Sequence, residues 1–195
     1  PLRESIRAGV GASVPVLTGT NKDENTLFVM EKMSSERLRK QAKTYGSESL
    51  IAAYREMLPD ATETELAIEL GTDFTFKIPA IRLAEDRVAR GADTWMYQFD
   101  WESRNAHLKA THALEIPFAF NMLMATGVDA FIGKGELPQA VADEMHGVWT
   151  SFIQGDEPSW PKYDLEKRTV QHFDNNSSVV ENGELPRLNA WEGIR

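Results

Sequence analysis

The feature that most constrains the fold of this chain is one aromatic segment, residues 94–100, which reads Thr-Trp-Met-Tyr-Gln-Phe-Asp. It carries a charge only at its last position, so neither face of a strand formed here would be favourable to expose to solvent. Such a segment predicts a strand that is buried on both faces, as in a mostly parallel sheet covered by helices. Residues 14–18 and 169–173 have shorter strand-like patterns. The sequence therefore predicts two or three strands.

Helical patterns fill much of the chain between the first and second of these strands. Ser34 or Ser35 can cap one helix. Ser47 or Ser49 can cap another that runs to Leu58, just before a proline. The first strand is therefore expected to be followed by several helices in succession.

Three more helices have clear boundaries. Thr62 opens the capping-box pattern Thr-Glu-Thr-Glu, which predicts a third helix. A fourth is expected over residues 78–90, where Gly91 ends it. The last lies between Pro138 and Gly155, and its apolar positions share one helical stripe: Val141, Met145, Val148, Trp149, Phe152 and Ile153.

Few strands among many helices indicate an α/β layer arrangement. The 195 residues suit one domain, and no repeat, low-complexity tract or linker divides them. However, two or three strands are too few for a free-standing doubly wound sheet. The pattern therefore indicates that a partner segment is missing from these residues.

The composition excludes several kinds of partner and site. A net charge of −9 and a pI near 5.0 argue against nucleic acid or anionic lipid as the main partner. The most apolar stretch, residues 116–133, is interrupted by Asn121, Thr126 and Asp129, so it is a poor membrane span. The absence of cysteine excludes disulfides, thiol catalysis and thiolate zinc sites. It also fits a reducing compartment, so a cytoplasmic location is the expectation.

Candidate chemistry therefore depends on hydroxyls, carboxylates and four histidines. His146 lies beside the apolar stripe of a helix and His172 lies in a strand, so both are interpreted as packed or rim side chains. His107 lies in a polar loop and is expected to be exposed. No two histidines have the helical spacing of a metal motif, although a loop could gather His107, His112 and Glu115 around a metal ion.

His112 differs from the other histidines in its position. It follows the predicted strand 94–100 by about a dozen residues, and loops after the carboxyl ends of strands form the active-site rim of doubly wound sheets. Glu24 follows the first predicted strand in the same way and could fix the tautomer of a histidine. Asp23 is the adjacent alternative. Either carboxylate could instead only cap the following helix.

Two segments around these residues resemble the type-B carboxylesterases. Gly-Thr-Asn-Lys-Asp-Glu, ending at Glu24 and followed by Phe28, is similar to the family segment G-x-N-x-D-E-G-x-x-F. His-Ala-Leu-Glu-Ile-Pro-Phe-Ala-Phe, starting at His112, resembles H-G-x-E-[IL]-x-[FY]-x-F. Downstream segments resemble the landmarks W-x-x-F, G-[DN]-P, W-P-x-Y and W-E, in the family's order, so the resemblance covers the whole chain.

The resemblance implies a fold and a chemistry. Residues 1–195 would be the C-terminal part of an α/β-hydrolase fold, helix-rich with a few strands of the central sheet. Glu24 would be the acid and His112 the base of a Ser-His-Glu triad that hydrolyses carboxylic esters, without metal or organic cofactor. The serine elbow G-x-S-x-G, which precedes the acid in chain order, does not occur here. The N-terminal half of the same protein would supply it and would be a partner of this chain.

Two positions depart from the family pattern, because Asn25 and Ala113 stand where glycines are usual. Glu115 matches the second segment and is interpreted as structural. A catalytically inactive, esterase-like binding domain is the alternative function, and an independent helical domain is a third. The isolated chain is expected to be inactive and to expose an apolar surface, which would lead to self-association or to capture of the missing segment.

Overall fold

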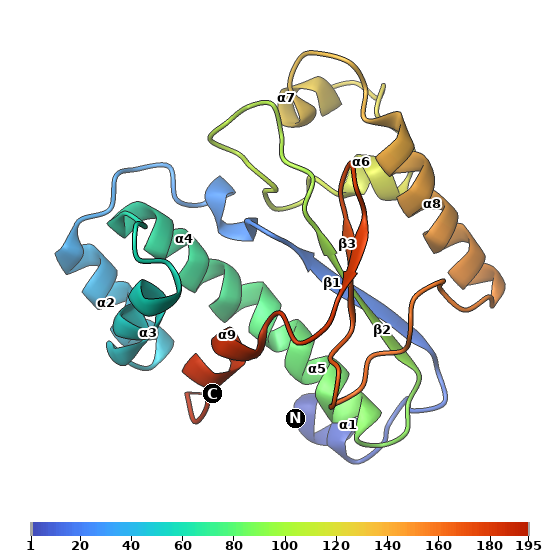
Figure 1. Cartoon of the computed structure of the whole chain (residues 1–195), viewed down its shortest axis with the longest axis horizontal. Coiled ribbons are helices and arrows are strands. Elements are labelled where there is room, and N and C mark those ends of the chain that lie inside the picture. Colours follow the sequence, from blue (N-terminus) through green and yellow to red (C-terminus); the bar gives the residue numbers. More distant parts are fainter. Residues whose placement is uncertain (1, 195) are drawn as a thin grey trace.

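The computed structural model describes residues 2–194, and within them a four-stranded sheet separates two groups of helices (Figure 1). Its strand order is β1-β2-β3-β4. The first three strands are parallel, and the last is antiparallel to its neighbour. The strands are β1 (Val16–Asn21), β2 (Thr94–Phe99), β3 (Val170–Phe173) and β4 (Ser178–Val180).

Helices make up most of the remaining ordered elements. Those before β2 are α1 (Leu2–Arg7), the 3₁₀ helix η1 (Glu24–Leu27), α2 (Ser35–Tyr45), α3 (Ser49–Met57), α4 (Glu63–Thr72), the π-helical turn η2 (Asp73–Lys77) and α5 (Ile78–Val88). Those after β2 are α6 (Ile116–Ala119), α7 (Val128–Ile132), α8 (Gln139–Gln154) and α9 (Leu185–Ala190).

Alternation along β2 explains why the sheet is covered on both faces. Trp95 and Phe99 point to one face and join the core formed with α6, α7 and α8. Met96 points to the other face and packs with Ile81 of α5. All three residues are at most 4% exposed. The prediction of a strand buried on both faces is therefore confirmed.

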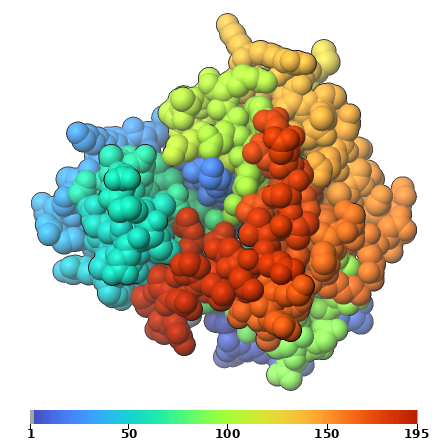
Figure 2. All heavy atoms as spheres, viewed as in Figure 1, coloured from blue at the N-terminus to red at the C-terminus, as the bar shows by residue number. Residues whose placement is uncertain are grey.

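A second core lies to one side of the sheet, among α2, α3, α4 and α9. Leu38, Leu50, Leu66 and Trp191 are each at most 1% exposed and belong to one apolar cluster. Figure 2 shows the C-terminal segment lying between the α2–α4 group and the orange α8 region. The end of the chain thus contributes to this core, because Trp191 follows α9 directly.

The predicted helices are present with shifted boundaries. Ser34 caps α2 through its hydroxyl, and Thr62 caps α4 with a complete capping box. The N-cap of α3 is Glu48 instead of a serine. The third and fourth helices were expected to be separate, but α4, η2 and α5 follow one another without a break. The π-helical turn η2 ends just before Pro79, whose nitrogen has no hydrogen for the usual helical bond.

The first strand lies two to three residues later than predicted. Gly19 and Asn21 were assigned to a turn, but they pair in register with Tyr97 and Phe99 of β2. Pairing overrides their low strand propensity. A Cβ on Gly19 would lie 2.2 Å from the carbonyl oxygen of Tyr97, so this close approach requires glycine.

Two further features differ from the prediction. Strand β4 was not predicted, because its three residues are mostly exposed and lack an apolar pattern. Ile153 is 80% exposed, although it was placed on the buried stripe of α8. Helical periodicity puts it roughly 120° from Val141, outside the face that packs on the sheet. Within residues 2–194, no helix has the length and apolar character needed to cross a membrane.

Candidate active site

The sheet topology brings the two predicted site residues to one edge. Strands β1 and β2 are parallel and end together, since Asn21 pairs with Phe99. Glu24 begins η1 three residues after the last residue of β1, and His112 lies in the loop that follows β2. Because the carboxyl ends of parallel strands share one edge of a sheet, both side chains reach the same rim.

Glu24 and His112 form a direct hydrogen bond. The Nδ1 atom of His112 lies 2.6 Å from Oε2 of Glu24, as the sequence predicts for this pair. The backbone amide of His112 also donates to the carbonyl oxygen of Glu24 at 3.3 Å. The carboxylate side chain is only 7% exposed, whereas the imidazole is 41% exposed. The carboxylate therefore holds Nδ1 from inside the protein, and Nε2 is the nitrogen available for chemistry at the surface.

Burial sets the electrostatics of Glu24. Loss of solvent raises the pKa of this carboxyl above its usual value. Hydrogen bonds from the amide of Asn21 and from His112 act in the opposite direction without cancelling the effect, and the nearby Glu115 raises the pKa further. A negative charge on Glu24 is thus costly at this buried position, and the hydrogen bonds from Asn21 and His112 offset only part of that cost.

Asp23, the alternative acid, has a different role. Its carboxylate accepts a hydrogen bond from the backbone amide of Ala110 at 3.3 Å, and its own amide donates to the carbonyl of Ala110 at 3.0 Å. Burial raises the pKa of this carboxyl as well. Asp23 therefore ties the loop after β2 to η1, and His112 is paired with Glu24 alone of these two carboxylates.

Asn21 is a site residue to which the sequence interpretation gave no role. Its backbone amide donates to Oε1 of Glu24 at 2.8 Å. Its side-chain amide donates to the carbonyl of Thr111 at 2.6 Å and to Glu115 at 2.5 Å. Asn21 thus holds Glu24 and the loop of His112 together. The signal was the asparagine in the first family-like segment, and Glu115 takes the structural position expected of it.

The two departures from the family pattern are accommodated differently. Asn25 lies within η1, so it does not occupy a left-handed position. Its backbone N–H donates to the hydroxyl of Thr72. Its side chain lies over Gly71, where a Cβ would be 2.1 Å from Nδ2. Ala113, in contrast, has φ +65°, a left-handed conformation that costs roughly 1–2 kcal/mol for a residue with a Cβ.

The other histidines do not join the pair. His107 is exposed, and His146 donates through Nδ1 to the carbonyl of Ala119 at 2.9 Å. His172 lies 2.6 Å from Asp100 at another strand end. Within the part of the chain that the structure describes, no three histidine, aspartate or glutamate side chains are placed to hold a metal ion. The alternative that grouped His107 with His112 and Glu115 around a metal is therefore wrong.

Comparison with known proteins points to one family. The model of the carboxylesterase family matches residues 2–191. The para-nitrobenzyl esterase of Bacillus subtilis (strain 168) is 29% identical over 188 residues, which cover 90% of this chain and 37% of that protein.

Solved structures give the same result. A carboxylesterase of Geobacillus stearothermophilus superposes with a TM-score of 0.83 at 31% identity, covering 97% of this chain and 42% of the other. A PNB esterase gives a TM-score of 0.75 at 26% identity over 96% and 40%. The chain thus spans about two fifths of the length of the proteins it resembles.

Proposed function

This chain belongs to the carboxylesterase family, and we propose that the complete protein hydrolyses carboxylic esters with Glu24 and His112 as two members of a Ser-His-Glu triad. The observation that carries the proposal is the 2.6 Å hydrogen bond between His112 Nδ1 and Glu24. With Nδ1 held by this bond, Nε2 is the ring nitrogen left to exchange a proton with the serine in this proposal. Residues 1–195 would form the C-terminal portion of the hydrolase domain, and the serine would lie in the N-terminal half.

The proposed chemistry follows from this geometry. Nε2 of His112 takes the proton of the serine hydroxyl as its oxygen attacks the ester carbonyl, and then delivers that proton to the leaving alcohol. A water molecule, deprotonated in the same way, releases the acid from the serine. In each step the imidazolium that forms is stabilised by the buried carboxylate of Glu24. No metal or organic cofactor takes part in this proposal.

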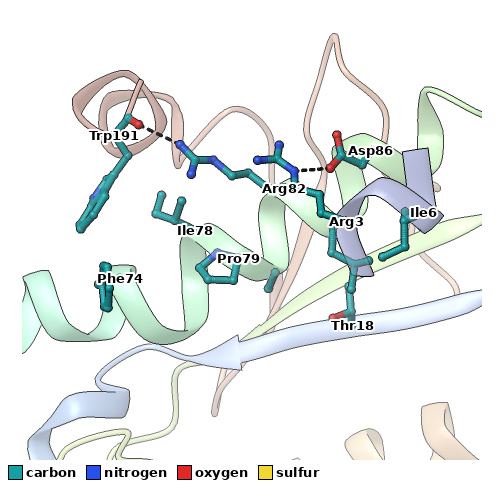
Figure 3. Close-up of a pocket in the computed structure, with 11 residues that line it drawn as sticks. Arg3, Ile6, Thr18, Phe74, Ile78, Pro79, Arg82, Asp86 and Trp191 are labelled. Atoms are coloured by element: carbon teal, nitrogen blue, oxygen red, sulfur yellow. Dashed lines mark hydrogen bonds and ion pairs between the residues drawn. The ribbon is translucent and has the colours of Figure 1, made fainter. Parts of the chain in front are cut away.

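An open groove supports the inferred N-terminal partner. Strand β1 is the first in the strand order, and no other strand within residues 2–194 pairs with its outer edge. Beside β1 lies a cavity of about 570 Å³ between α1, β1, α5 and the Trp191 side chain that follows α9 (Figure 3). Its walls are largely apolar and include Thr18, Ile78 and Trp191, and neither Glu24 nor His112 lines it. A free parallel edge beside an apolar cavity is a surface that a further segment would cover.

The test compares the chain with the complete protein. The complete protein is expected to hydrolyse p-nitrophenyl esters and to be labelled by a fluorophosphonate on a serine before residue 1. The isolated chain should do neither, and should either self-associate or bind the separately expressed N-terminal half. His112-dependent turnover by the isolated chain would contradict the proposal. Glycine or alanine at the nucleophile position, with no turnover, would favour the esterase-like binding domain instead.

A further inference from the structure

Two aromatic rings contact the imidazole of His112. The ring of Phe76 lies 4.9 Å from it, centroid to centroid, at an interplanar angle of 35°. The ring of Phe28 lies 5.6 Å away at 44°. Both distances are typical of favourable aromatic pairs. The imidazole thus has two ring contacts and the bond to Glu24, although 41% of its side chain is exposed.

The two rings are held very differently. Phe28 is the C-cap residue of the short helix η1 and is 58% exposed. Phe76 lies inside the π-helical turn η2, where the amide of Ile78 bonds to the carbonyl of Asp73, five residues earlier. Such turns are uncommon and often occur at functional sites. The turn places Phe76 on the side of the helix that faces the loop of His112.

Ion pairs fix this turn at both ends. Asp73 is fully buried and accepts hydrogen bonds from the Tyr54 hydroxyl and from Arg187, the latter at 2.8 Å. Lys77 is 4% exposed, and its Nζ lies 3.4 Å from Glu184. Removing one partner of a buried ion pair is strongly destabilising, so the turn resists rearrangement. Phe76 is therefore anchored by the core on the far side of the helix.

We propose that Phe76 is a positioning residue for the general base. The turn η2 holds the ring of Phe76 against His112, so that the imidazole keeps the orientation set by Glu24. The inference rests on the proposed function for its kinetic consequence. A histidine bonded only through Nδ1 can still rotate about its side-chain bonds, and a misplacement of about 1 Å can lower a rate roughly 100-fold. The ring of Phe76 removes this freedom by packing against the imidazole.

The kinetic test uses the complete protein. Phe76→Ala is expected to lower kcat about 10- to 100-fold with little change in KM, because orientation and not substrate binding is lost. The loss should be the same for p-nitrophenyl acetate, butyrate and octanoate. Phe76→Leu, which keeps an apolar side chain of similar reach, should restore most of the rate. A loss that depends on acyl length, or that appears in KM, would overturn the proposal and make Phe76 a wall of the substrate site.

A matched control separates positioning from stability. Phe152 of α8 is another half-buried phenylalanine, away from Glu24 and His112. Its ring packs edge-on against that of Trp95, at 5.8 Å between centroids. Phe152→Ala should destabilise the fold comparably but leave kcat per folded molecule unchanged. Equal losses of kcat in both variants would contradict the positioning role.

A spectroscopic readout remains informative if the protein proves to be inactive. In protein labelled with ¹³C-histidine, the ring protons of His112, assigned with His112→Gln, should be shifted upfield by the two adjacent rings. In Phe76→Ala this shift should fall and the signal should show motional averaging. An unchanged His112 signal would contradict the inference, whereas absence of esterase activity alone would contradict only the proposed function.

Discussion

The chain holds two histidine–carboxylate pairs that have the same bond length and different surroundings. His112 and Glu24 are joined through Nδ1 at 2.6 Å, and so are His172 and Asp100. Both pairs lie where parallel strands meet the rim, since Asp100 follows β2 and His172 belongs to β3. The bond alone therefore does not distinguish a catalytic pair from a structural one.

The surroundings do distinguish them. Burial raises the pKa of Glu24, and its hydrogen bonds do not reverse that effect. Burial acts in the same direction on Asp100, but the hydrogen bond and charge of His172, with the hydrogen bond of Gln98, outweigh it and lower the pKa. The imidazole of His172 is 16% exposed against 41% for His112. An acid whose charge is poorly compensated, beside an accessible imidazole, is the arrangement expected of a functional pair.

The largest expected difference between the two pairs is in turnover, when the histidine of each pair is removed. In the complete protein, His112→Ala should lower kcat for p-nitrophenyl esters by about four to six orders of magnitude, because the proposed general base is lost. His172→Ala should leave turnover per folded molecule unchanged. Steady-state kinetics on both variants measure the difference. A comparable loss for His172→Ala would remove the distinction between the pairs.

Replacing each acid by its amide tests the same comparison more finely. Glu24→Gln keeps the size of the side chain but removes the charge, so kcat should fall about 10³- to 10⁴-fold, as for other triads that lose their acid. Asp100→Asn should lower stability without lowering turnover per folded molecule. If Glu24→Gln retained full activity, Glu24 would be a helix-capping or packing residue.

The packing beneath Glu24 provides a smaller effect. A Cβ on Gly71 would displace the side chain of Asn25, so Gly71→Ala should destabilise the protein by about 1–2 kcal/mol. In the Asn25→Gly background, which has the glycine usual in the family, the same substitution should stabilise by about 0.5–1 kcal/mol through helix propensity. A thermodynamic cycle of the four proteins measures this coupling. Equal effects in both backgrounds would show that Asn25 moves aside freely.

The sequence predicted much of the fold because its strongest signals are local. The aromatic strand, the capping box at Thr62 and the helix between Pro138 and Gly155 all carry their own boundary residues, and each is present. The continuity of α4, η2 and α5 was missed, since a proline ordinarily predicts a helix start. The extension of β1 through Gly19 depends on pairing with β2, which local propensity does not contain.

For the site, the resemblance and strand positions predicted the pairing of Glu24 with His112. They did not predict the contributions of distant residues. Phe76 contacts His112 from a π-helical turn, and nothing in the local sequence marks that turn. Nor did the strand pattern of His172 reveal its bond to Asp100, because Asp100 follows β2, His172 lies in β3, and the two meet only in the folded sheet.

The smallest expected effect is a difference in pH dependence between the two acids. A lowered pKa for Asp100 means that its charge stabilises the fold above the unfolded value of about 3.9, and that this contribution is lost as the pH falls through the folded pKa. Asp100→Asn should therefore cost about 1 kcal/mol near pH 7, and the deficit should shrink below about pH 4. Thermal midpoints between pH 3 and 7 measure it.

The contribution of Glu24 to fold stability should change with pH in the opposite direction to that of Asp100. Its raised pKa means that the fold binds a proton more tightly than the unfolded chain does, so ionisation costs stability as the pH rises from about 4.5 through the folded pKa. Glu24→Gln removes that cost. Relative to the wild type, this variant should therefore gain stability between about pH 4.5 and 7, by up to about 1 kcal/mol, while Asp100→Asn is a net loss over the same range. If the midpoints of Glu24→Gln fell in parallel with those of Asp100→Asn, the two carboxylates would share one electrostatic environment, and the argument that separates a functional pair from a structural pair would fail.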